Sequence, residues 1–243
     1  MTNPDLSAET ADAPVISLVE VSRVHGSGAA AVEALKRVSM QVAAGELVAV
    51  MGPSGSGKST LLNLAGGLDR PTSGQVVVEG TDVGALPPRR LAELRRRHVG
   101  YVFQDLNLIP SLTAVENVML PRELDGVRAG KARSEASHAL AEMGVAEVAG
   151  RFPDEISGGQ RQRVAIARAM VGVRRVLLAD EPTGALDTPT GDDVIQALRA
   201  RADSGSAVLL VTHEPRYAAW ADRVIFLRDG EIADSAEAQA TTR

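Results

Sequence analysis

Short apolar runs, broken by glycine and proline, alternate along the chain with longer stretches of mixed apolar and polar residues. The short runs are rich in valine, leucine and isoleucine and predict buried strands, whereas the mixed stretches predict helices. Predicted strands cover residues 15–24, 38–42, 47–51, 76–78, 99–103, 175–179, 207–212, 223–227 and 231–233. Predicted helices cover 58–65 and 87–97, and segments near 113–122, 131–144 and 159–171.

The order of these elements predicts the fold class. Strands and helices alternate up to Gln104, the next segment is mainly helical, and strands then return. This order is typical of a mostly parallel α/β core that carries a helical insertion. We therefore expect one domain over 14–233, with its core at 14–104 and 172–233 and a helical subdomain at 105–171. We also expect a flexible tail over 1–13 and a frayed tail over 234–243.

Composition limits the functions open to this chain. With 44% apolar but only 2% aromatic residues, its core must be built from aliphatic side chains and methionine. The net charge of −5 does not favour nucleic-acid binding, and the absence of cysteine excludes disulfides, thiol catalysis and cysteine metal sites. The N-terminus does not resemble a signal peptide, and the longest apolar runs are strand-sized. We expect a soluble chain whose membrane role, if it has one, depends on a partner.

A glycine-rich segment lies between the strand at 47–51 and the helix at 58–65. It fits the pattern G-x-x-x-x-G-K-[ST] in the context of strand, loop and helix that a phosphate-binding loop requires. Glycine lets the backbone wrap a phosphate, and N–H groups at a helix start attract negative charge. Lys58 would reach the β- and γ-phosphates, and Ser59 would offer its hydroxyl to Mg²⁺. A glycine turn with a chance lysine is the alternative. The loop comprises Gly52, Pro53, Ser54, Gly55, Ser56, Gly57, Lys58, Ser59 and Thr60.

Two acids follow the apolar strand at 175–179. In a nucleotide site, the first acid, Asp180, would hold Mg²⁺, and the second, Glu181, would orient or polarise the attacking water. Strands often end in an acid, so the pair alone is weak evidence. Its combination with the phosphate-binding loop makes the interpretation strong.

The segment Ser157-Gly158-Gly159-Gln160 precedes the predicted helix at 159–171. Ser157 could be only the N-cap of that helix. This alternative leaves the second glycine unexplained, because glycine weakens a helix start. A loop that brings its backbone close to an anion explains both glycines and the serine.

With the residues that follow it, Arg-Gln-Arg-Val-Ala-Ile-Ala-Arg-Ala, this segment resembles the signature of ATP-binding-cassette (ABC) ATPases. The resemblance extends from about residue 15 to about 233 and includes all the expected motifs in order. It implies a P-loop NTPase core with an N-terminal antiparallel β subdomain and an inserted α-helical subdomain. Ile156 stands where leucine is usual, a mild departure.

The resemblance also implies roles for single residues. Gln104 matches the Q-loop glutamine, which touches Mg²⁺ and connects the core to the helical subdomain. Asp180 and Glu181 match the Walker B aspartate and the catalytic glutamate, and Ala185-Leu186-Asp187 matches the D-loop. His213 matches the switch histidine at the γ-phosphate, although a lone histidine after a strand is usually a surface residue. The implied catalytic residues are Glu181, His213, Gln104 and Lys58, and the implied metal ligands are Ser59, Gln104 and Asp180.

One position departs from the family pattern. ABC cassettes usually stack an aromatic residue from an N-terminal loop on adenine, but no Phe, Tyr or Trp precedes Tyr101. His25 occupies the matching position, and its ring offers a smaller face than tyrosine. We expect His25 to pack on adenine with weaker base discrimination than usual. The alternative is a solvated loop histidine.

In this family, one chain holds only half of each reaction centre. The resemblance therefore implies a second cassette, whose Ser157, Gly158, Gly159 and Gln160 would cover the γ-phosphate, and a homodimer around two Mg-ATP is expected. It further implies a separate membrane permease docked on the apolar loop after Gln104, at the inner face of the cell membrane. The leucines of that loop could instead seat the helical subdomain on the core.

Several stretches, among them Phe-Pro-Asp-Glu-Ile-Ser-Gly-Gly, resemble the group of lipoprotein-releasing, macrolide-export and cell-division cassettes. The sequence thus predicts an ATPase subunit of an exporter or mechanotransmission complex. One alternative is a soluble ABC ATPase that acts on ribosomes or DNA, although such proteins usually carry two cassettes or a long coiled coil. Another is an ATP-binding scaffold with little turnover, against which the intact Glu181 and His213 argue.

Overall fold

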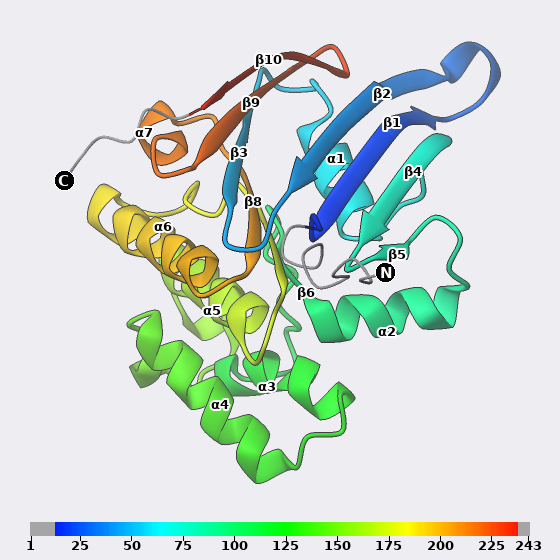
Figure 1. Ribbon diagram of the computed structural model, residues 1–243. Helices are drawn as coiled ribbons and strands as arrows, with labels where there is room; N and C mark the ends of the chain where they lie inside the picture. The colour runs from blue at the N-terminus through cyan, green and yellow to red at the C-terminus, as the bar shows by residue number, and fades with distance from the viewer. Residues whose placement is uncertain (1–12, 238–243) are drawn as a thin grey trace, which may run out of the picture.

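The computed structural model describes residues 13–237, so most of the two predicted tails, 1–12 and 238–243, lies outside the described residues. Figure 1 shows the elements along the chain. They are β1 (Ile16–His25), β2 (Val32–Val42), β3 (Leu47–Met51), α1 (Lys58–Ala65), β4 (Ser73–Val78), β5 (Thr81–Asp82), α2 (Pro88–His98), β6 (Val99–Val102), α3 (Ala114–Leu124), α4 (Ala129–Glu142), α5 (Gly158–Met170), β7 (Val176–Asp180), α6 (Thr188–Asp203), β8 (Ala207–Val211), α7 (Pro215–Ala218), β9 (Arg223–Arg228) and β10 (Glu231–Glu237).

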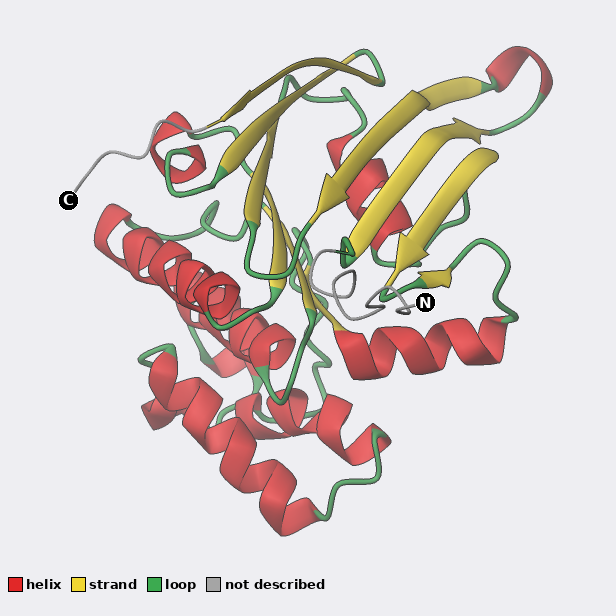
Figure 2. Cartoon of the chain, viewed as in Figure 1, coloured by secondary structure: helices red, strands yellow, loops and turns green. Residues whose placement is uncertain are grey.

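Two sheets form the framework of the molecule (Figure 2). The six-stranded sheet has the order β10-β9-β3-β8-β7-β6, in which the five strands from β9 to β6 are parallel and β10 is antiparallel to β9. The four-stranded sheet has the order β2-β1-β4-β5 and is antiparallel throughout. The expected fold class, a mostly parallel core with an N-terminal antiparallel subdomain and inserted helices, is confirmed.

Strand β3 shows why its sequence is continuously apolar. Leu47 and Ala49 belong to the hydrophobic cluster on the side of α5 and α6, whereas Val48 and Val50 belong to the cluster shared with α1 and the antiparallel sheet. Successive side chains of a strand point to opposite faces, and both faces of this central strand are covered. A strand buried on both sides needs an apolar residue at every position.

The inserted helices α3 and α4 lie at the end of the molecule opposite β1 and β2 (Figure 1). Thr113 and Glu116 form a capping box that begins α3, in which the backbone N–H of Thr113 donates to Glu116 Oε2 at 2.8 Å. Among residues 13–237, no helix is both long and apolar enough to cross a membrane.

Several elements differ from the sequence predictions, among them the short strand β5 and the short helix α7, which were not predicted. Strand β2 begins at Val32 rather than at residue 38, because its largely exposed first half pairs with the end of β1, with Val32 opposite His25. Helix α6 was not predicted, although Asp187 caps it by accepting from the backbone N–H of Thr190 at 3.3 Å. The frayed tail was expected from residue 234, but β10 continues to Glu237 because its backbone pairs with β9, with Asp234 opposite Phe226.

Candidate active site

Four neighbouring parallel strands end at the same edge of the large sheet and bring the predicted site residues together. Strand β3 leads into Gly52, β8 is followed by His213, β7 ends in Asp180, and Gln104 follows β6. Ligands of open α/β sheets bind at the carboxyl ends of the strands. A cavity of about 500 Å³ lies there, lined by Ala34, Gly52, Pro53, Ser54, Gly55, Gly57, Lys58, Ser59, Thr60, Gln104, Asp180, Glu181 and His213.

The glycines of the phosphate-binding loop serve different purposes. A Cβ on Gly52 would lie 2.0 Å from the carbonyl oxygen of Leu227, and a Cβ on Gly57 would lie 2.4 Å from that of Ala34. These two glycines are needed for close packing of the loop on its own chain. Gly55, with φ of +77°, has no neighbour within 4 Å of its Cβ position and is needed only for its left-handed backbone.

The start of α1 is suited to bind an anion. Its N-cap is Gly57, which has no side chain to accept from the N–H groups of the first turn. Lys58 is buried, and its Nζ donates to the carbonyl oxygens of Gly52 and Pro53, at 2.8 Å each. The lysine charge therefore lies within the loop and adds to the positive end of the helix dipole.

Oxygen donors for a cation lie beside this helix start. Burial raises the pKa of Asp180, and the repulsion from Glu181 acts in the same direction, whereas the hydroxyl of Ser59 and the charge of Lys58 lower it. No group of three His, Cys, Asp or Glu side chains within residues 13–237 could hold a metal. Mg²⁺ typically uses one or two carboxylates and completes its shell with water and phosphate oxygens, so Ser59, Asp180 and the Gln104 side chain fit it.

Glu181 and His213 contact each other across the cavity. Glu181 Oε1 lies 3.3 Å from His213 Nδ1, and the side chains are 27% and 62% exposed. The backbone of Glu181 has φ of +46°, which is strained for a non-glycine residue, and its N–H donates to the carbonyl of Val211. Such strain concentrates at functional sites. Here it turns the carboxylate out of β7 toward the neighbouring strand end.

The signature segment lies away from this cavity. Ser157 is the N-cap of α5: its Oγ accepts from the backbone N–H of Gln160 at 3.2 Å, and its own N–H donates to Gln160 Oε1 at 2.9 Å. Within one chain, Ser157 therefore acts as the N-cap of α5, as the alternative in the sequence analysis expected. A Cβ on Gly159 would lie 3.4 Å from Leu186, which places the signature segment against the predicted D-loop. None of Ser157 to Gln160 lines the cavity.

His25 is also outside the cavity lining. It is the exposed last residue of β1, where it pairs with Val32. The next strand instead contributes Ala34, which the sequence analysis did not single out because an alanine carries no chemical signal. The stacking of His25 on adenine stays a prediction.

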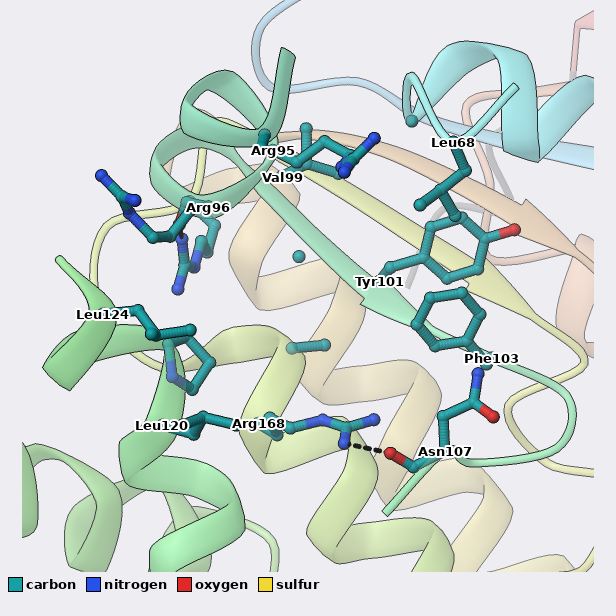
Figure 3. Close-up of a pocket in the computed structure, with 16 residues that line it drawn as sticks. Leu68, Arg95, Arg96, Val99, Tyr101, Phe103, Asn107, Leu120, Leu124 and Arg168 are labelled. Carbon is teal, nitrogen blue, oxygen red and sulfur yellow. Dashed lines mark hydrogen bonds between the residues drawn. The ribbon is translucent and has the colours of Figure 1, made fainter. Parts of the chain in front are cut away.

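A second hollow, of about 340 Å³, lies between α2, α3 and α5 with β6 as its floor (Figure 3). Of the loop predicted to contact a permease, only Asn107 lines it, while Leu108 packs against the core. We call this hollow the β6 groove. Its lining comprises Gly66, Leu68, Ala92, Arg95, Arg96, Val99, Gly100, Tyr101, Phe103, Asn107, Leu120, Pro121, Leu124, Arg168, Ala169 and Arg174.

The comparison with known proteins agrees with this geometry. The family model "ABC transporter" matches residues 35–184. The macrolide export ATP-binding/permease protein MacB of Salmonella choleraesuis (strain SC-B67) is 46% identical over 229 residues, which are 94% of this chain and 35% of that protein. MacB of Hyphomonas neptunium (strain ATCC 15444) is 47% identical over 228 residues, or 93% of this chain and 35% of that protein. The chain spans about a third of the length of these curated relatives.

Solved structures show the same fold. A dimeric post-hydrolysis state of the ATP-binding cassette MJ0796, bound to ADP and Pi, superposes with a TM-score of 0.88 at 39% sequence identity. The match covers 93% of this chain and 99% of the MJ0796 chain. A second dimeric structure of MJ0796, a bacterial ABC transporter cassette, matches with the same TM-score at 40% identity. The predicted resemblance is confirmed, and this chain belongs to the ABC transporter family, as an ATPase cassette of that family.

Proposed function

We propose that this chain binds Mg-ATP in the cavity at the carboxyl ends of β3, β8, β7 and β6, and hydrolyses it as half of a dimer. One observation carries the proposal: the phosphate-binding loop, Gln104, Asp180, Glu181 and His213 line a single cavity. The family membership and the ADP- and Pi-bound relative support it.

The proposed reaction is the transfer of the γ-phosphoryl group to water. Lys58 and the N–H groups at the start of α1 bind the phosphates. Ser59, Gln104 and Asp180 would hold Mg²⁺, which would supply positive charge against the transferred group. Glu181 accepts a proton from the attacking water. At the same time, the water oxygen bonds to the γ-phosphorus, and the bond between that phosphorus and ADP breaks. His213 contacts Glu181, so we assign it to positioning the carboxylate, and its resemblance to the switch histidine assigns it also to contact with the γ-phosphate.

The second wall of the site would come from another copy of the chain. Ser157, Gly158, Gly159 and Gln160 lie outside the cavity of their own chain, which supports their use in a partner's site. The relative MJ0796 is dimeric. The dimer would then close around two Mg-ATP and open after hydrolysis, and this motion would be the mechanical output.

The output would drive a membrane permease. The relatives named MacB are macrolide export ATP-binding/permease proteins, and their other two thirds lie beyond this chain. We propose that a permease, of exporter or mechanotransmission type, docks in the β6 groove and holds two cassettes at the cytoplasmic face of the membrane. Leu68 and Leu124 are 43% and 60% exposed at this groove, as expected for an apolar docking surface.

The substitution Glu181→Gln tests the hydrolytic role. We expect turnover to fall by about 10²- to 10⁴-fold, since a general base contributes on this scale, while ATP binding persists. The variant should accumulate as a dimer with ATP, measured by light scattering. Glu214→Gln, a neighbour of His213 outside the cavity lining, is the matched control and should keep wild-type turnover. Wild-type turnover in Glu181→Gln would contradict the assignment.

The same assay separates the alternatives. An ATP-binding scaffold would show no steady-state hydrolysis in the wild type. A soluble ABC ATPase would hydrolyse ATP without a permease, and reconstitution with the permease that co-purifies from membranes would leave its turnover unchanged.

A further inference from the structure

The turn between β9 and β10 touches both β2 and the phosphate-binding loop. Its central residues are Asp229 and Gly230, with φ of +51° and +81°, and they join the paired residues Arg228 and Glu231. A two-residue turn with two left-handed residues follows the twist of its strands, and Asp-Gly is a favoured pair for it. The turn lies beside β2 (Figure 1), where the backbone N–H of Lys36 donates to the carbonyl oxygen of Gly230 at 2.8 Å.

Gly230 also donates a hydrogen bond to the phosphate-binding loop. Its backbone N–H lies 3.1 Å from the carbonyl oxygen of Ser56. Ser56 is buried, and no other donor reaches that oxygen within residues 13–237. A buried carbonyl group without a donor costs free energy comparable to that of a lost hydrogen bond. The loop therefore depends on a contact with a turn near the other end of the chain.

This bond fixes the orientation of one peptide group of the loop. The peptide is planar and trans, so the C=O of Ser56 and the N–H of Gly57 point in opposite directions. Because the carbonyl points at Gly230, the Gly57 N–H points away from the turn. Gly57 lines the nucleotide cavity, whereas Ser56 and Gly230 do not. In the part of the chain that the structure describes, the Gly57 N–H donates to no acceptor, which leaves it for a ligand.

Three backbone segments meet at this point without room for a side chain. A Cβ on Gly230 would lie 3.0 Å from the carbonyl oxygen of Ala34, and a Cβ on Gly57 would lie 2.4 Å from the same oxygen. Ala34 itself lines the nucleotide cavity. The turn thus ties β2 to the phosphate-binding loop, and a shift of Gly230 would displace both walls of the cavity.

We propose that Gly230 is a positioning residue for nucleotide binding: its N–H holds the Ser56 carbonyl and thereby aims the Gly57 N–H at a phosphate of the nucleotide. The proposal rests on the Mg-ATP binding proposed above and adds a residue that does not touch the ligand. The Gly57 N–H would bind the phosphate in the ground state and in the transition state alike. Loss of its orientation should therefore raise the KM for ATP and leave kcat nearly unchanged.

The test removes the N–H of Gly230 and leaves its side of the turn otherwise intact. Glycolic acid replaces Gly230, so that the bond to Asp229 becomes an ester without a donor. The chain has no cysteine, so a synthetic segment 221–243 with a temporary cysteine at Ala221 is ligated to residues 1–220 and then desulfurised to alanine. We expect the KM for ATP and the Kd of a fluorescent ATP analogue to rise by about two- to tenfold, the scale for one hydrogen bond, while kcat changes less than about twofold.

The matched control places the same ester one residue earlier. Malic acid replaces Asp229, whose N–H donates to no acceptor among the described residues. This ester should keep the KM, Kd and kcat of the wild type. Equal KM values in the wild type and the Gly230 ester would overturn the proposal, and so would equal increases in the two esters.

A ligand without a base locates the effect at the phosphates. Tripolyphosphate competes with the fluorescent ATP analogue for the cavity, and its affinity is measured in the same assay. The ester at Gly230 should weaken tripolyphosphate and ATP by the same factor. A loss for ATP without a loss for tripolyphosphate would overturn the assignment to a phosphate.

If the Gly230 ester does not refold, the variant Gly230→Ala decides. Its Cβ would press on the Ala34 carbonyl, so the KM for ATP should rise at least about twofold. Gly205→Ala is its control, because Gly205 has φ of +100° and nothing within 4 Å of its Cβ position. Equal KM values in these two variants would overturn the proposal. The two proposals fail separately: a wild type that binds no ATP removes the proposed function, whereas a wild type that binds ATP no more tightly than the Gly230 variants removes only the positioning role.

Discussion

Helices α1 and α5 both begin at glycine-rich segments, yet their first turns are satisfied in different ways. Gly57 begins α1 without a side-chain cap, whereas Ser157 begins α5 with a capping box formed with Gln160. The first turn of α1 therefore lacks acceptors from its own chain and is left to bind a ligand. The first turn of α5 is partly satisfied without any ligand.

Under the proposed function, this difference shows how one chain can carry two segments for the phosphates of ATP without bringing them together in one subunit. The uncapped start of α1 lies in the cavity with Lys58, so the proposed nucleotide binding needs only a single subunit. The capped start of α5 is preformed by its own side chains, and in the proposed dimer it would contact an ATP held by another subunit. Similar glycine content at the two helix starts would thus serve nucleotide binding at α1 and dimer assembly at α5.

The substitution Gly57→Ala should have the largest effect on this comparison. Its φ is +104° and the new Cβ would lie 2.4 Å from the carbonyl oxygen of Ala34, so the loop must shift. We expect the free energy of unfolding to fall by at least about 1–3 kcal/mol and nucleotide binding to be lost. Urea unfolding and binding of a fluorescent ATP analogue measure the two effects.

Gly80→Ala is the matched control for that substitution. Gly80 also has a left-handed backbone, with φ of +70°, but nothing lies within 4 Å of its Cβ position. Gly80→Ala should lower the free energy of unfolding only by the cost of the left-handed backbone conformation, and it should keep nucleotide binding. Equal losses in the two variants would mean that close packing of the loop is unimportant.

Ser157→Ala should have the next largest effect and separates the two roles of the serine. Removing an N-cap costs about 1 kcal/mol of stability. We expect ATP binding to one subunit to be unchanged and dimer-dependent turnover to fall by about 10²-fold, the scale for losing one donor to the transferred group. Ser157→Asp keeps an N-cap acceptor but places a negative charge near the γ-phosphate. Ser157→Asp should keep the stability of the wild type and lose ATP turnover. Wild-type turnover in this variant would exclude Ser157 from the site.

Gly158→Ala should change turnover without a loss of stability. The nearest atom to its Cβ position is Arg161 Nη2 at 3.8 Å, so the folded chain has room for the methyl group. Replacing a helical glycine with alanine stabilises by about 0.5–1 kcal/mol. We expect a small gain in thermal stability and a clear loss of ATP turnover. Gly130→Ala in α4 is the control: nothing lies within 4 Å of its Cβ position, and it should raise thermal stability without changing ATP turnover.

His25→Ala should have the smallest effect. An aromatic stack contributes about 0.5–1.5 kcal/mol, so the KM for ATP should rise by about two- to tenfold, with a different change for GTP. Stability should stay within about 0.5 kcal/mol, because His25 is exposed. Unchanged kinetic constants for both nucleotides would remove His25 from the site, in agreement with its position outside the cavity lining.

Local signals predicted the elements around the site well. Strand β3 and helix α1 have the predicted bounds, because an apolar run ending in glycine and a helix ended by two glycines are both specified by neighbouring residues. Helix α6 was missed although it has an Asp187 cap and a buried face of Val194, Ile195 and Leu198. The helix begins with Thr188-Pro189-Thr190-Gly191, and proline followed by glycine is typical of a turn rather than of a helix.

Contacts between distant residues could not be predicted in the same way. Arg168 lies 62 positions from Leu106, and neither residue type indicates that a guanidinium will hold a left-handed turn. The apolar loop after Gln104 suggested a partner surface, but α2, α3 and α5 provide most of the groove. The same limit applies to Ala34, which lines the cavity at the phosphate-binding loop and whose carbonyl oxygen lies beside Gly57.

The sequence by itself determined the phosphate-binding loop, the acids after β7, the signature segment and hence the family, because each is a contiguous motif whose chemistry depends on local spacing. Only the tertiary structure decided that Gln104, Asp180, Glu181 and His213 meet the loop in one cavity, that Ser157 caps its own helix instead, and that four arginines gather around an apolar groove. Those facts depend on strand order and helix packing, which many weak long-range contacts select together.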